Sequence, residues 1–138
     1  KIGKNIMPKL TFILTLLLML IACNSIGTKQ KGEGLVTTMD EYIAALRWGR
    51  FDSAIEYHLN KDETLQEIDT SQLEYIKVTE HSIKKKTINE DMDEALVEVR
   101  MEYYHSQYAT VKKIIFKQIW WLHEKSRKWY LSSDFPKF

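Results

Sequence analysis

The chain has 138 residues, with 20 lysines and arginines against 19 aspartates and glutamates, which gives a formal net charge of +1. This length suits one domain, and the near-neutral charge gives no reason to expect binding to nucleic acid. The single cysteine excludes a disulfide framework or a cysteine-rich zinc site within the chain.

An apolar run of 13 residues, Leu10 to Ala22, stands near the start of the chain. It follows the short segment Met7-Pro8-Lys9, and this order of a basic segment and an apolar segment is typical of a signal peptide. The run is shorter than the ~20 apolar residues that a membrane-spanning helix needs. We therefore predict a signal peptide over residues 1–22, with Met7 as its start.

The residues that follow, Leu20-Ile21-Ala22-Cys23, resemble a bacterial lipobox. This resemblance implies that Cys23 is acylated and anchors the protein to the cell envelope, since two or more acyl chains hold a protein stably on a membrane. Asn24 in place of aspartate favours the outer membrane, with the domain facing the periplasm. The alternatives are a plain secretory signal or a buried helix with an incidental cysteine.

Polar residues and three glycines fill residues 24–35, so we predict a flexible tether over residues 23–35 and a folded domain over 36–138. Thr38 has the character of a helix N-cap. Apolar residues at helical spacing follow it, and Gly49 predicts the end of this helix. A second, short helix is expected after Asp52.

From residue 73 the pattern changes to that of strands, which we expect over 73–88, 95–104, 111–123 and 128–133. Turns at 89–93 and 124–127 connect them as antiparallel hairpins. One register places Glu98 opposite Lys117 and Glu102 opposite Lys113 on the outer face. The same register gathers an apolar inner face, the predicted core, from Val97, Val99, Met101, Ile114, Phe116, Trp120, Leu122, Trp129 and Leu131.

The segments TTMDEYIAALRWGRFDSAIEYHL and IWWLHEKSRKWYLSSDFPKF resemble small bacterial lipoproteins with an NTF2-like, cystatin-like fold. The resemblance covers roughly residues 36–138. It implies an α+β domain in which N-terminal helices pack on the concave face of a curved four-stranded antiparallel sheet, a cone. Its motifs carry the fold rather than a reaction.

Two candidate sites follow from the expected arrangement. On the outer face, apolar residues predict an interface for an envelope protein or a second copy of the chain, unless the segment 134–138 covers them. These residues are Leu96, Ile115, Ile119, Trp121 and Tyr130. Inside the cone, four residues could line a pocket for a small apolar ligand. They are Tyr42, His58, Tyr103 and Gln118.

A histidine in such a pocket could act as a general base, so His58 is the one candidate for catalysis, and its alternative role is that of a satisfied core residue. The spacing of the four histidines predicts no metal site, and no cofactor motif is present. The sequence therefore predicts a lipid-anchored, non-catalytic binding domain. The alternative is a hydrolase or isomerase that acts on a small apolar ligand in the cone.

Overall fold

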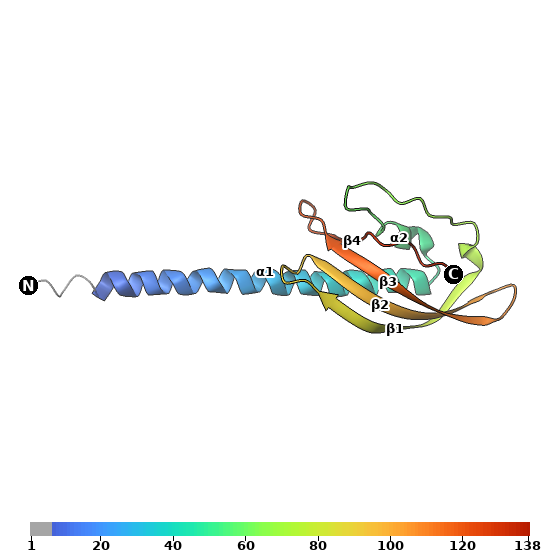
Figure 1. Ribbon diagram of the computed structural model, residues 1–138, viewed down its shortest axis with the longest axis horizontal. Coiled ribbons are helices and arrows are strands. Elements are labelled where there is room, and N and C mark those ends of the chain that lie inside the picture. The colour runs from blue at the N-terminus through green and yellow to red at the C-terminus, as the bar shows by residue number, and fades with distance from the viewer. Residues whose placement is uncertain (1–6) are drawn as a thin grey trace, which may run out of the picture.

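The computed structural model describes the backbone of residues 7–138 and the side chains of residues 27–138. This part of the chain folds as an α+β domain in which helices precede a four-stranded antiparallel sheet of order β1-β2-β3-β4 (Figure 1), as predicted. Its elements are α1 (Met7–Arg47), α2 (Phe51–Ile55), a short 3-10 helix (Leu73–Tyr75), β1 (Ile76–Ile88), β2 (Glu94–His105), β3 (Val111–Leu122) and β4 (Trp129–Leu131).

The strands pair in the predicted register. Glu98 lies opposite Lys117 and Glu102 opposite Lys113, where the lysine Nζ is 3.0 Å from the Glu102 carboxylate. β3 and β4 also pair as expected. A slip by one residue would turn these charges towards the core, so the charge pattern specifies the register strongly.

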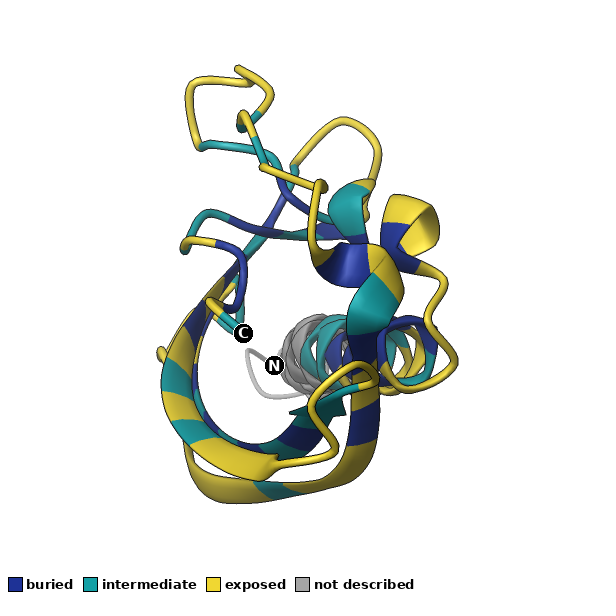
Figure 2. Cartoon of the chain, turned by 90° about the vertical axis from the view of Figure 1, so that its right-hand side faces the viewer, coloured by how far each residue is buried: buried dark blue, intermediate teal, exposed yellow. Residues whose placement is uncertain are grey.

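The sheet curves around the C-terminal half of α1 (Figure 2), and buried residues alternate with less buried ones along β2. Two register shifts in β1, between Val78 and Glu80 and between Ile83 and Lys85, contribute to this curvature because bulges bend a strand. Seven of the nine predicted core residues are buried; Ile114 and Phe116 are only partly buried and pack against the core.

Residues 24–35 differ from the prediction of a flexible tether, because they belong to α1. Leu35 is fully buried, and the Nε1 of Trp129 donates a hydrogen bond to the Lys31 carbonyl at 3.2 Å. A glycine in a helix costs about 1 kcal/mol, whereas burying one leucine gains about 1.5–3 kcal/mol. Tertiary packing thus outweighs the local preference, and the folded domain begins before residue 36.

The sequence predicted a start of the helix at Thr38, which is wrong, and an end at Gly49, which is confirmed. Thr38 is not an N-cap: it lies inside α1, where its Oγ1 donates to the Gly34 carbonyl at 2.9 Å. Gly32 allows a close approach, since a Cβ at this position would lie 3.0 Å from the terminal carbon of Met92. The predicted stop at Gly49 is confirmed, because its φ of 67° is in the left-handed region that ends helices.

Residues 1–6 and the side chains of residues 7–26 lie outside the described part of the chain. The predicted signal peptide and the acylation of Cys23 fall there and stay predictions. Within the described part, no helix combines the length and apolar character that a bilayer span requires.

Candidate functional site

A hydrogen-bonded polar group lies inside the core. Tyr42 on α1 and His58 after α2 are both buried, and the tyrosine hydroxyl is 3.1 Å from the histidine Nε2. The Nδ1 of His58 lies 3.2 Å from the backbone carbonyl of Ser133. Because a carbonyl only accepts, Nδ1 carries the proton, and Nε2 accepts from the hydroxyl of Tyr42. Both ring nitrogens of His58 are therefore engaged.

Burial controls the protonation of this pair. It lowers the pKa of His58 below 6.5, against the opposite influence of the Ser133 carbonyl, Gln66 and Asp134. It also raises the pKa of Tyr42 above 10. Both groups are neutral at pH 7, and a general base needs a nitrogen that substrate can reach. The geometry therefore favours a structural role for His58.

Of the other two predicted pocket residues, Gln118 joins this group and Tyr103 does not. The Oε1 of buried Gln118 accepts from the Nε1 of Trp120 at 3.0 Å, and the Trp120 ring meets Tyr42 edge-on at 5.7 Å. The Nε2 of Gln118 has no hydrogen-bond partner among the described residues. Tyr103 is buried separately, with its ring 5.1 Å from that of Phe138.

The C-terminal segment 134–138 fills the concave side of the sheet. The ring of Phe135 lies 5.1 Å from His58, and that of Phe138 lies 6.1 Å from Phe51. The alternative in which this segment covers the outer face is therefore wrong. The space expected for a ligand holds aromatic side chains instead, and none of the four predicted pocket residues lines any of five clefts found on the described part of the chain.

The five residues predicted for an interface divide into two sets. Leu96, Ile115 and Ile119 are 43%, 64% and 40% exposed, and we call these three the outer patch. Trp121 and Tyr130 are half-buried instead. The loop after α2 covers Trp121, whose Nε1 donates to the Leu59 carbonyl at 2.9 Å, and the ring of Tyr130 lies 6.0 Å from that of Trp121.

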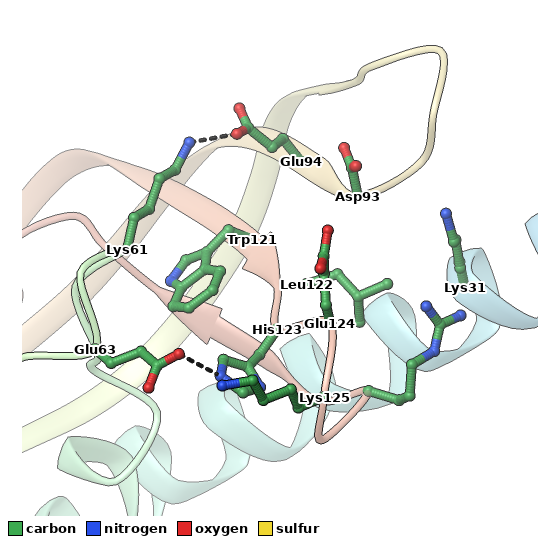
Figure 3. Close-up of a pocket in the computed structure, with 11 residues that line it drawn as sticks. Lys31, Lys61, Glu63, Asp93, Glu94, Trp121, Leu122, His123, Glu124 and Lys125 are labelled. Atoms are coloured by element: carbon green, nitrogen blue, oxygen red, sulfur yellow. Dashed lines mark hydrogen bonds and ion pairs between the residues drawn. The ribbon is translucent and has the colours of Figure 1, made fainter.

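Next to Trp121 lies a charged cleft of about 570 Å³, formed by α1, the loop after α2 and two hairpin turns (Figure 3). Lys61 forms an ion pair with Glu94, and His123 contacts Glu63. The four acids and four basic residues that line it balance each other, so its charge favours no ionic class of ligand. The lining residues are Lys31, Lys61, Glu63, Asp93, Glu94, Trp121, Leu122, His123, Glu124, Lys125 and Arg127.

At the cleft, His123 contacts a glutamate of the lining and a serine beside it, a grouping that the sequence did not predict. The Nδ1 of His123 lies 3.1 Å from the amide nitrogen and 3.0 Å from the Oγ of Ser126, and its Nε2 lies 3.2 Å from the Glu63 carboxylate. Because the amide donates to Nδ1, Nε2 carries the proton and donates to Glu63. The lone pair that a nucleophilic serine would need is thus used to close the β3–β4 turn.

His123 ends the strand predicted over 111–123, and Ser126 lies in the turn predicted over 124–127. This spacing of three residues could have indicated a side chain that caps the turn. Glu63 is 60 residues away from the histidine, and no local pattern connects them. Among the described residues, no three His, Cys, Asp or Glu side chains lie close enough together to hold a metal ion.

No known protein family, curated protein or solved structure matches this chain. The function is therefore argued from the residues of the chain and the geometry described above.

Proposed function

We propose that the chain is a lipid-anchored protein of the bacterial cell envelope whose NTF2-like domain binds a partner protein through the outer patch. The anchor is supported by the order of the leader, in which Lys9 and an apolar run precede Leu20-Ile21-Ala22-Cys23. Asn24 supports a place on the outer membrane, facing the periplasm. The NTF2-like assignment is supported by a curved antiparallel sheet around a long helix.

The exposure of the outer patch carries the binding proposal. The outer face of an antiparallel sheet is normally polar, yet three large aliphatic side chains lie in water here. Leu96 and Ile119 are direct cross-strand neighbours, and Ile115 follows on the same face of β3. An exposed apolar patch of this kind usually marks an interaction site. Burying each side chain on a partner would contribute about 1.5–3 kcal/mol before the cost of association.

Metabolic labelling with palmitate in a Gram-negative host tests the anchor. The wild-type chain should incorporate label and Cys23→Ala should not, because the chain has no other cysteine. Asn24→Asp is the matched control: it should keep the label and move the protein to the inner membrane. Label on Cys23→Ala would refute the lipid anchor.

A photo-crosslinking amino acid at Ile119, introduced in the intact envelope, tests the binding proposal. It should yield a discrete adduct that Leu96→Glu abolishes. The same amino acid at Tyr108, which is 72% exposed but lies at the β2–β3 turn, should yield no such adduct. Equal crosslinking at both positions would refute binding of a partner through the outer patch.

A second candidate is a small apolar ligand, favoured by a cleft of about 640 Å³ beside the C-terminal segment. Its apolar lining comes from Ile68, Leu73, Ile76, Phe135 and Phe138. Native mass spectrometry of the full chain in detergent tests this candidate, since a bound molecule adds a discrete mass. His58 does not line this cleft, so a hydrolase or isomerase there would need a different base.

A further inference from the structure

One long edge of the sheet is open. β4 pairs only with residues 120–122 of β3. One step further, the amide of Ser132 donates to the Ile119 carbonyl at 2.9 Å, and the amide of Ile119 donates to the Ser133 Oγ at 3.1 Å. Beyond that point, the described part of the chain provides no strand beside residues 111–118 on this side of β3.

The hydrogen-bonding groups on this edge can be assigned from the alternation of the strand. Since Ile119 directs its N–H and C=O away from β2, every second residue before it does the same. Lys117, Ile115 and Lys113 therefore point their backbone groups towards the open edge, while the intervening residues bond to β2. These three residues offer three N–H groups and three carbonyls to an extended segment, and Val111 at the start of the strand has the same orientation.

The C-terminal segment of the chain itself cannot fill this edge. If it continued in the register of β4, Pro136 would lie opposite Ile115, at a position that requires an N–H donor. Instead, Phe135 turns inwards and packs against His58. A groove of about 520 Å³ remains between β3 and this segment, with Ile114 and Phe116 on its inner side.

The charges along the open edge indicate which kind of segment can pair with it. Lys112, Lys113 and Lys117 lie on the open part of β3, whereas Lys137 at the groove forms an ion pair with Asp134. Within the described part, Glu102 is the acid that ion-pairs with one of the β3 lysines. A second copy docked on the same edge would bring two sets of three lysines into one short seam, and like charges across strands repel. An acidic segment avoids this repulsion.

We propose that an acidic, extended segment of a partner protein adds to β3 as a fifth strand. This inference rests on the proposed binding function and specifies its mode. Addition to a sheet edge gives affinity through main-chain hydrogen bonds and specificity through alternate side chains. On the outer face the segment carries an acid, an apolar residue and an acid opposite Lys113, Ile115 and Lys117. On the inner face its apolar residues enter the groove beside Phe116.

Hydrogen exchange at single-residue resolution tests this mode, with the full chain in detergent micelles. The probe is the capped peptide SEVVVES, which has this alternation, and its matched control is SKVVVKS. The glutamate peptide should slow exchange of the amides of Lys113, Ile115 and Lys117 at least about tenfold at saturation, and the lysine peptide should not. Absence of protection, or equal protection by both peptides, would overturn the proposal.

Two variants of Ile115 separate the contribution of its backbone N–H from that of its side chain. Ile115→Pro removes an outward N–H without removing a bond to β2, and should abolish protection. Ile115→Ala keeps that N–H and loses only part of the outer patch, so protection should return once the peptide concentration is raised to saturation. If Ile115→Pro loses the pairing with β2, the same test is made on the wild-type chain with a glutamate peptide whose central valine is N-methylated. Binding of this methylated peptide would refute strand addition.

The outcomes also distinguish this mode from the proposed function. A patch-dependent adduct at Ile119 without edge protection would leave a binding domain and reject the fifth strand. Loss of both signals would reject both proposals.

Discussion

Acidification should destabilise this fold through one buried histidine. His58 is 2% exposed, and its two ring nitrogens lie against the hydroxyl of Tyr42 and the carbonyl of Ser133. Its pKa is lower in the folded chain than its ordinary value of 6.5, because burial disfavours the charged ring. The unfolded chain therefore binds a proton at a pH where the folded chain does not, and unfolding becomes easier as the pH falls.

The size of this effect follows from the unfolded pKa alone, as long as the pH stays above the folded value. Each pH unit below 6.5 then removes about 1.4 kcal/mol from the free energy of unfolding. At a pH of about 5.5 the loss from His58 is therefore at most about 1.4 kcal/mol, relative to a pH of about 7.5. Carboxylates have ordinary pKa values near 4, so this window separates the histidine from the acids.

Urea unfolding of the full chain in detergent, followed by tryptophan fluorescence at the two pH values, measures this loss. His58→Gln removes the titrating group and should shrink the difference between the two pH values by up to about 1.4 kcal/mol. His81→Gln is the matched control, because His81 is exposed and has no role in the core. An unchanged pH dependence in His58→Gln would refute the assignment of a neutral, structural histidine.

Three further predictions, which use five substitutions, can be tested with the same unfolding assay. Tyr42→Phe should cost about 1–3 kcal/mol, because it leaves the Nε2 of its histidine partner buried without a donor. Leu35→Ala should cost about 2–5 kcal/mol if α1 enters the core before residue 36, whereas Val36→Ala, at a 45% exposed site, should cost less than about 0.5 kcal/mol. Gly34→Ala should stabilise α1 by about 0.5–1 kcal/mol, and Gly49→Ala should destabilise by about 1 kcal/mol because its φ is positive.

The sheet could be predicted from the sequence because its signals are local and redundant. The alternation of apolar and polar residues in β2 assigns the two faces of the sheet. The pairing of Glu98 with Lys117 and of Glu102 with Lys113 then determines the register. A wrong register would bury charge, so few alternatives compete. The end of α1 at Gly49 is equally local, since one backbone conformation decides it.

The start of the domain could not be predicted in this way. The glycines among residues 24–35 indicate a flexible segment when only propensity is considered. Tertiary contacts stabilise the helix here, through the burial of Leu35 and the hydrogen bond from Trp129, which is far away in the sequence. The course of the C-terminal segment likewise depends on Phe135 finding His58 in space. Contacts of this kind leave no periodic pattern in the sequence.

A continuous α1 has a consequence for the proposed anchor. Helix geometry places Cys23 about 13 Å along the axis from Gly32, where Met92 of the β1–β2 turn packs. The domain would then be held on a rigid stalk, with the β1–β2 and β3–β4 turns towards the anchor and the β2–β3 turn away from it (Figure 1). The open part of β3 begins at Val111, next to that distant turn. A partner that approaches from the side away from the membrane would therefore reach the free edge first at its exposed end.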